Sequence, residues 1–262
     1  MKLDIMVVTH KNLSDINEPI PNDSEYIPMV VGPNKDNVSF SDFLRDDTGE
    51  NIAAKNPNYC ELTALYWAWK NLQDDYCGLV HYRRYFVTSF NKPIPTQTIK
   101  EYLKEVDVLL PKKRYHDGET NLELYSRRHY KKDLIETRSI IDEFYPEYTA
   151  AFDKVMNDKS LHSYNMMIMK KSVLDNYCSW LFDILEKLEN RTDISGYDAH
   201  QARIYGFISE RLLDVWLTTN NIQYKELPVR FLEKRSIVVR VNEQLNHLKN
   251  RMRNKKKGQA NG

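Results

Sequence analysis

A cluster of basic side chains follows a short apolar run near the middle of the chain. Residues 77–80 are apolar and typical of a buried strand. His81, Arg83 and Arg84 come directly after this run, among aromatic residues. Ligands of open α/β sheets bind at the carboxyl ends of strands, and the guanidinium group suits phosphate. The pattern predicts an anion site, with ordinary surface side chains on buried stems as the alternative.

Two other apolar runs end in the same way. The residues that follow them are Thr9, His10 and Lys11 after Leu3–Val8, and Lys112 to His116 after Val106–Pro111. If these strands are parallel neighbours of the one at 77–80, all three groups lie along one edge of the sheet. The chain has 8 glycines and no Walker or dinucleotide-binding fingerprint, so phosphate recognition falls to side chains.

A turn-rich segment, Leu44–Ile52, contains adjacent carboxylates at Asp46 and Asp47 and the amide of Asn51. One interpretation is a metal site. However, the segment follows no strong strand, and aspartates in turns form local hydrogen bonds. Long irregular segments inside compact domains are often functional. The sequence therefore favours a loop that folds over a ligand.

A carboxylate lies early in the next predicted helix. Leu62, Leu65 and Trp69 recur at helical spacing, and Asn58 is a suitable N-cap. Glu61 falls in the first turn on the apolar side, where a carboxylate needs a partner. We expect a cation from the strand ends to supply it.

Three later segments add candidates. Asn121–Asp158 predicts a polar helical insertion over one side of the sheet, Met166–Met169 predicts a strand, and Gln201–Leu217 predicts a long helix. The polar residues in or beside them are His129, His162, Asn165, Glu210 and Arg211. A solvated helix face is the alternative for the basic residues of the insertion.

The composition is that of a soluble globular protein. The 262 residues are 41% hydrophobic and 29% charged, which is enough for one α/β domain with helical additions or for two small domains. The net charge of +1 gives no case for a nucleic-acid partner. No apolar run is long enough to span a bilayer, and the N-terminus lacks a signal peptide, so we expect a cytoplasmic protein. The three cysteines have no zinc-site spacing and are expected to be reduced packing residues.

The chain ends in a basic segment. Leu245, Leu248 and Met252 form one stripe of a predicted helix that is otherwise rich in lysine and arginine. Such a helix favours a membrane surface or a protein partner, and a solvated tail is the alternative. We therefore divide the chain into a domain at 1–235 and a basic C-terminal helix at 236–262.

Four segments carry a resemblance to a known family: Arg45–Ile52, Lys55–Trp67, Gly78–Phe86 and Gly206–Leu213. They resemble a family common in bacterial capsule and exopolysaccharide loci, long labelled a domain of unknown function and grouped with GT-A glycosyltransferases. The resemblance covers the chain up to about Glu233. It implies an α/β, GT-A-like (Rossmann-like) mixed sheet with flanking helices, and transfer of a sugar from a nucleotide sugar to a growing glycan. Some relatives are associated with galactofuranose transfer from UDP-galactofuranose.

The resemblance also implies roles for residues. GT-A enzymes usually carry Asp-x-Asp after the central strand, where a divalent metal neutralises the diphosphate. This chain has His81-Tyr82-Arg83 there, which favours a metal-independent enzyme without excluding Mg²⁺ or Mn²⁺. Arg83 and Arg84 would then stabilise the departing diphosphate. Glu210 is similar to the acidic residue that serves as base in inverting enzymes, with a structural pair to Arg211 as the alternative.

The remaining roles follow from the same comparison. The expected donor-side residues are Thr9, His10, Lys11, Asp47, Asn51, Glu61, His81, Arg83, Arg84 and Lys112. The expected acceptor-side residues are His129, His162, Asn165 and Arg211, and no metal ligand is expected. Thr9 and His10 would lie near the uridine of a UDP-sugar.

The expected acceptor is a lipid-linked oligosaccharide at the inner membrane face, reached through the basic helix. A homodimer is left open. The alternatives are a non-catalytic protein that binds nucleotide sugars or glycans, a nucleic-acid-processing enzyme, and a retaining rather than an inverting transferase.

Overall fold

The computed structural model describes residues 1–11, 21, 23–33, 42–89 and 92–231. The predicted C-terminal helix at 236–262 lies outside the described residues. None of the helices in the described part of the chain is long and apolar enough to cross a membrane.

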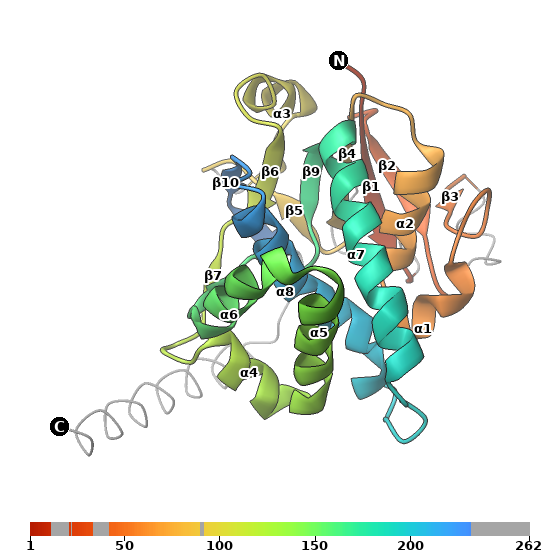
Figure 1. The fold of residues 1–262 in the computed structure, drawn as a ribbon. Coiled ribbons are helices and arrows are strands. Elements are labelled where there is room, and N and C mark those ends of the chain that lie inside the picture. The colour runs from red at the N-terminus through yellow and green to blue at the C-terminus, as the bar shows by residue number, and fades with distance from the viewer. Residues whose placement is uncertain (12–20, 22, 34–41, 90–91, 232–262) are drawn as a thin grey trace, which may run out of the picture.

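A mixed sheet forms the centre of the fold (Figure 1). In spatial order its strands are β10 (Lys225–Leu227), β6 (Val108–Pro111), β9 (Met167–Lys170), β4 (Tyr76–His81), β1 (Leu3–Thr9), β2 (Tyr26–Val30) and β3 (Leu44–Arg45). Along this path β9 is antiparallel to both of its neighbours, and the other pairs are parallel. In addition, β5 (Arg84–Phe86) pairs antiparallel with β4 and with β11 (Val229–Phe231), and β7 (Arg114–Tyr115) pairs with β8 (Ser160–Leu161).

Helices flank this sheet. Their bounds are α1 (Asn56–Tyr59), α2 (Leu62–Asn71), α3 (Thr96–Tyr102), α4 (Asn121–Arg128), α5 (Lys131–Phe144), α6 (Thr149–Asn157), α7 (Lys171–Arg191) and α8 (Ile204–Thr219). Short 3₁₀ turns occur at Ala53–Lys55, Pro146–Tyr148 and Gln201–Arg203. Figure 1 shows α2 and α7 over one face of the sheet, with α4, α5 and α6 gathered around α8. The expected mixed α/β sheet with flanking helices and a helical insertion is confirmed.

The two faces of the sheet bury separate cores. Side chains of successive strand residues point to opposite faces. Ile5 and Val7 of β1 therefore pack in a core with residues of α3 and β5. Met6 and Val8 of the same strand pack in a larger core with α2, α7 and α8. Burial on both faces explains why the first strand is an almost unbroken apolar run.

Three details differ from the sequence-based expectations. The helix predicted from Asn58 is two helices, because Cys60 takes φ = 53° between α1 and α2. The strands β4 and β6 are not neighbours, because the antiparallel β9 lies between them. They still run in the same direction, so the residues after both strands emerge at one edge. The last predicted strand is divided at Pro228 into β10 and β11.

Candidate active site

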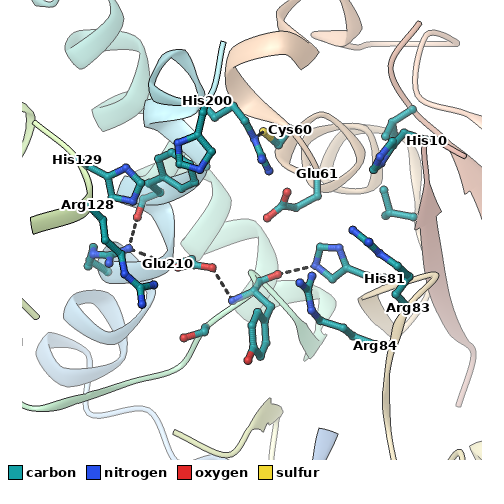
Figure 2. Close-up of a pocket in the computed structure, with 18 of the residues that line it drawn as sticks. His10, Cys60, Glu61, His81, Arg83, Arg84, Arg128, His129, His200 and Glu210 are labelled. Carbon is teal, nitrogen blue, oxygen red and sulfur yellow. Dashed lines mark hydrogen bonds and ion pairs between the residues drawn. The ribbon is translucent and has the colours of Figure 1, made fainter. Parts of the chain in front are cut away.

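A cleft of about 790 Å³ opens at the carboxyl ends of β1 and β4 (Figure 2). The register of β1 and β4 pairs Val8 with His81, so the segments after both strands leave the sheet side by side. Its charged side chains among the described residues are Lys11, Glu61, Arg83, Arg84, Arg114, Arg128, Arg203, Glu210 and Arg211. Five of the chain's seven histidines also line it: His10, His81, His116, His129 and His200. The cleft is therefore strongly cationic, with two carboxylates.

The residues after β4 form the wall nearest the sheet. Arg83 lies with its guanidinium 4.9 Å from the centre of the Tyr82 ring, and Arg84 lies 4.6 Å from the centre of the Tyr164 ring. These cation–π contacts hold the side chains against flat surfaces. His10 packs edge-on against Tyr82 at 5.6 Å between ring centres. Figure 2 shows His10, His81, Arg83 and Arg84 together on this side.

His81 is neutral in this setting. Burial and the nearby Arg84 charge lower its pKa to about 4. Its Nε2 lies 2.6 Å from the carbonyl oxygen of Tyr164, which can only accept, so Nε2 carries the proton. Nδ1 of His81 is then a hydrogen-bond acceptor at the edge of the cleft.

This histidine predicts a loss of stability in acid. The unfolded chain protonates its histidines near pH 6.5, whereas folded His81 takes a proton only near pH 4. Between these values the unfolded state binds more protons, so the free energy of unfolding falls as the pH drops. We expect His81→Gln to reduce the loss between pH 7 and pH 5, measured by urea unfolding, by about 1 kcal/mol. An unchanged pH dependence in this variant would contradict the assignment.

Glu210 comes from α8 and reaches the middle of the cleft (Figure 2). Its Oε1 accepts a hydrogen bond from the backbone N–H of Tyr164 at 2.7 Å. Its Oε2 lies 3.4 Å from Nη1 of Arg211, and the Glu210 side chain is 23% exposed. The carboxylate is thus fixed in orientation yet accessible from the cleft, which a general base requires.

Glu61 is the second carboxylate of the cleft. The positive φ of Cys60 turns the chain between α1 and α2, and Glu61 is then the N-cap residue of α2. Figure 2 shows Glu61 directed into the space between the two sides of the cleft. Its Oε1 accepts a hydrogen bond from Nδ2 of Asn165 at 2.8 Å. Its hydrogen-bond partner is thus an amide, and its charge also interacts with that of Arg84, one of the strand-end cations that the sequence predicted as a partner.

The dipeptide Tyr164–Asn165 connects both carboxylates. Its φ angles are 82° and 50°, a left-handed conformation that is costly for tyrosine. This conformation directs the Tyr164 N–H to Glu210, its C=O to His81 and the Asn165 amide to Glu61. Strained backbone of this kind persists where surrounding contacts enforce it, and it is concentrated at functional sites.

Asn165 provides a test of this arrangement. Its side chain is buried, donates to Glu61 and to the carbonyl of Gly206, and accepts from Ser209. Asn165→Asp retains the volume and the tolerance for positive φ but places a second carboxylate against Glu61. We expect a loss of about 1–3 kcal/mol in the free energy of unfolding. Donor turnover should fall at least about tenfold beyond the unfolded fraction.

The matched control is Asn220→Asp, at the exposed end of α8, where the amide donates to the Tyr148 hydroxyl. This change is expected to cost less stability and no specific activity. An Asn165→Asp protein with full activity would show that Glu61 needs no positioning.

The opposite side of the cleft comes from α4 and α8. The ring of His129 stacks on Phe207 at 4.0 Å between centres, and His200 stacks on His129 at 5.7 Å. Burial lowers the pKa of His129 to about 4, so this ring is also neutral near pH 7. Arg128 lies beside His129 (Figure 2). This wall presents neutral rings next to cations.

Comparison with known proteins shows the family to which this chain belongs. The model of a family described as a domain of unknown function (DUF4422) matches residues 4–221. The chain belongs to this family. A solved structure titled as the apo form of the WbbM bifunctional glycosyltransferase also matches, with a TM-score of 0.78 and 30% sequence identity. The match covers 88% of this chain and 45% of that chain, so this chain spans less than half the length of WbbM. A search of the curated proteins finds no match.

The resemblance to a family of formerly unknown function with a glycosyltransferase fold is confirmed by these matches. For a DUF4422 chain with this fold, the place where GT-A enzymes usually carry Asp-x-Asp bears on whether the cleft can hold a metal ion. Within the described ranges, no group of three His, Cys, Asp or Glu side chains is placed to hold a metal ion. Glu61 and Glu210 are tied to Asn165 and Tyr164, and seven Lys and Arg side chains share their cleft. This donor set does not fit a divalent cation.

Nine of the predicted site residues line the cleft: His10, Lys11, Glu61, His81, Arg83, Arg84, His129, Glu210 and Arg211. Asn165 lies behind it and acts through Glu61. The other five predicted residues lie elsewhere.

Thr9 and Lys112 do not line the cleft, and the reason differs between the two residues. The hydroxyl of Thr9 is buried and donates to the carbonyl of Lys11, so it shapes the turn after β1. The backbone N–H of Lys112 continues the pairing of β6 by donating to Leu227, and its side chain is exposed outside the cleft lining. The chain reaches the cleft only two residues later, at Arg114.

The loop of residues 46–51 packs against α2 and does not fold over the cleft. Asp47 pairs with Arg45, and Asn51 donates to the carbonyl of Gly49. Asp46 is buried and accepts from the hydroxyl of Thr63 on α2. The local hydrogen bonding typical of aspartates in turns thus accounts for this segment.

His162 is a structural residue in this fold. Its side chain is fully buried, with Nδ1 2.5 Å from Asp214 and Nε2 3.0 Å from Glu226. Lys113 lies 3.6 Å from Asp214 and adds a cation to the cluster. These contacts hold the segment that leads into β9 against α8 and β10. His162 therefore supports the fold, whereas the sequence suggested a role in binding the acceptor.

Several residues of the cleft were not selected from the sequence. Arg114, His116 and Arg128 belong to basic clusters that were visible, but nothing local distinguished them from their neighbours. Arg203 is the last residue of the 3₁₀ turn before α8, and His200 directly precedes that turn. Their placement depends on the packing of α8 across the sheet, for which the sequence gives no local signal.

Proposed function

We propose that this protein transfers a sugar from a nucleoside diphosphate sugar, UDP-linked in the first instance, to a hydroxyl group of an acceptor glycan. The observation that carries the proposal is a cationic cleft at the carboxyl ends of β1 and β4 that contains a fixed, accessible carboxylate. The glycosyltransferase title of the matching structure supports the same class of reaction. The donor sugar proposed is galactofuranose or another hexose.

The proposed reaction is an inverting displacement. Glu210 accepts the proton of the acceptor hydroxyl, and the oxygen attacks the anomeric carbon as the bond to the diphosphate breaks. The diphosphate leaves with the bonding electron pair, and Arg83 and Arg84 stabilise its charge through charge-assisted hydrogen bonds. His81, being neutral with a free Nδ1 lone pair, is placed to accept from a hydroxyl of the donor sugar. The Tyr164 peptide fixes Glu210 and His81 relative to each other.

The setting of the reaction remains a proposal from the sequence. A lipid-linked oligosaccharide would be the acceptor, and the basic C-terminal segment would bring the protein to the cytoplasmic face of the inner membrane. A nucleotide-sugar or glycan-binding protein without catalysis is the second candidate, because the cations alone would account for binding.

Protection against thermal unfolding tests the donor class. UDP, GDP, CDP and dTDP are each added to the full chain, with and without EDTA. A ligand at about a hundred times its Kd stabilises the folded state by about 2.7 kcal/mol, which corresponds to a rise in Tm of several degrees. We expect UDP to raise the Tm equally in both conditions. A shift that EDTA abolishes would contradict the arginine-based proposal, and no shift with any nucleotide would contradict the donor class.

A further inference from the structure

A second group of cations lines the cleft, apart from Arg83 and Arg84. Figure 2 shows Arg128 on the far side of Glu210 from those two arginines. It belongs to a group that we call the second cationic group: Arg114 on β7, His116, Arg128 at the end of α4, and Arg211 on α8. These residues lie close enough that Arg114, Arg128 and Arg211 all lower the pKa of His116, after burial itself.

The charges of this group are poorly compensated within the described residues. Arg211 has a side chain only 6% exposed, and its buried Nε finds no partner there. Its nearest carboxylate is Glu210, at 3.4 Å. Nε2 of His116 is likewise buried without a partner in the described ranges. A buried polar atom without a partner costs free energy, and a bound ligand is one way to supply the partner.

The two exposed members of the group are Arg114 and Arg128, of which Arg114 interacts with Tyr164. Within the part of the chain that the structure describes, neither Arg114 nor Arg128 forms an ion pair, although Arg127 next door is paired with Glu119. Arg114 lies 5.4 Å from the centre of the Tyr164 ring, and Arg84 lies 4.6 Å from the same centre. The Tyr164 ring and Glu210 therefore lie between the two cationic groups.

In the proposed reaction, the donor diphosphate does not need this group. In an in-line displacement the acceptor and the leaving group occupy opposite sides of the anomeric carbon. The base lies with the acceptor, so Arg83 and Arg84 on one side of Glu210 hold the leaving diphosphate. Cations on the other side of Glu210 then face the acceptor. A sugar-nucleotide diphosphate carries two negative charges, fewer than the seven Lys and Arg side chains that line the cleft.

We propose that the second cationic group is a binding site for an oxyanion on the acceptor, either a phosphate group or the carboxylate of an acidic sugar. The inference rests on the proposed function, because it takes Glu210 as the base. The acceptor is thereby an anionic glycan, seated with its anionic group among Arg114, His116, Arg128 and Arg211 and its reactive hydroxyl at Glu210.

Calorimetric titration of the full chain in EDTA tests the site. With UDP saturating, inorganic phosphate and glucuronate are the two probes, and glucose is the neutral control. We expect at least one anion to bind alongside UDP. The double variant Arg114→Gln, Arg128→Gln should weaken that binding at least about tenfold while UDP affinity stays within about twofold. Binding of phosphate alone would assign the site to a phosphate group, and binding of glucuronate alone to an acidic sugar.

The reciprocal variant and a control complete the design. Arg83→Gln, Arg84→Gln should weaken UDP binding and spare the anion, and Arg127→Gln, at the exposed and already paired neighbour, should spare both. Competition between the anion and UDP would overturn the inference. Equal loss of UDP affinity in both double variants would also overturn it, since the two groups would then form one diphosphate site.

Failure of the proposed function would look different. If UDP does not bind the wild-type chain, the anion titration is run without it. Anion binding that depends on Arg114 and Arg128 would then support the anion site and count against a UDP-linked donor. Anion binding that is independent of these two arginines would remove the site.

Discussion

Glu210→Gln is expected to reduce sugar transfer by about 10²–10⁴-fold and to leave UDP affinity within about twofold. Oε1 of Glu210 accepts a hydrogen bond from the Tyr164 N–H at 2.7 Å. The amide oxygen of glutamine can still accept this bond, so the side chain keeps its orientation. What it loses is the ability to take a proton from the acceptor hydroxyl. The measurement is kcat from UDP release, together with a calorimetric UDP titration of the same preparation.

A matched control is Glu119→Gln, a partly exposed carboxylate outside the cleft lining that pairs with Arg127. It should leave kcat unchanged. If Glu210→Gln retains transfer within about threefold of the wild type, Glu210 is not the base. Glu61→Gln then becomes the decisive variant, because Glu61 is the other carboxylate of the described cleft.

Arg84→Gln is expected to show the opposite pattern, a loss of donor affinity as well as of turnover. Arg84 is largely buried beside the Tyr164 ring, where charge-assisted hydrogen bonds to a diphosphate are worth about 1.5–3 kcal/mol. This corresponds to a loss of about 10–100-fold in UDP affinity. Turnover at saturating donor should fall further, because negative charge on the leaving group grows in the transition state.

The control for this variant is Arg127→Gln, which removes a paired arginine outside the cleft. Equal loss in both variants would indicate a general effect of net charge, and unchanged UDP affinity in Arg84→Gln would place the diphosphate elsewhere. Arg84→Lys is a further check, since a single ammonium group cannot form the two parallel hydrogen bonds of a guanidinium. It should restore only part of the affinity.

The sheet and its functional edge could be predicted because they depend on local patterns. A strand buried on both faces is an apolar run, and the first polar residues after it must lie at its carboxyl end. His10, His81, Arg83 and Arg84 were located in this way, and the structure places all four in the cleft. The same reasoning fails for Lys112, because β6 continues its pairing through that residue before the chain turns.

Other site residues depend on tertiary packing. His162 and Asn165 precede the same strand by a few residues, yet one is buried between Asp214 and Glu226 and the other supports Glu61. Arg203 reaches the cleft from the turn before α8, where its Nε donates to the thiol of Cys60. Such contacts join residues 52 to 143 positions apart, and no local pattern encodes them.

The left-handed pair Tyr164–Asn165 is a further example. Asparagine tolerates positive φ and tyrosine does so reluctantly, so the sequence alone gives no signal for a left-handed pair here. The strain is retained because three hydrogen bonds, to His81, Glu210 and Glu61, depend on it.

Release of UDP from nucleotide sugars is the measurement that tests the central claim most directly. The full chain is incubated in EDTA with UDP-galactofuranose, UDP-galactose or UDP-glucose, with and without a lipid-linked oligosaccharide preparation, and free UDP is measured over time. We expect release from at least one donor above the buffer rate, faster with acceptor, and strongly reduced in Glu210→Gln and Arg84→Gln. UDP-sugars that bind to the cleft yet stay intact with every acceptor would contradict this expectation and would favour a non-catalytic binding protein.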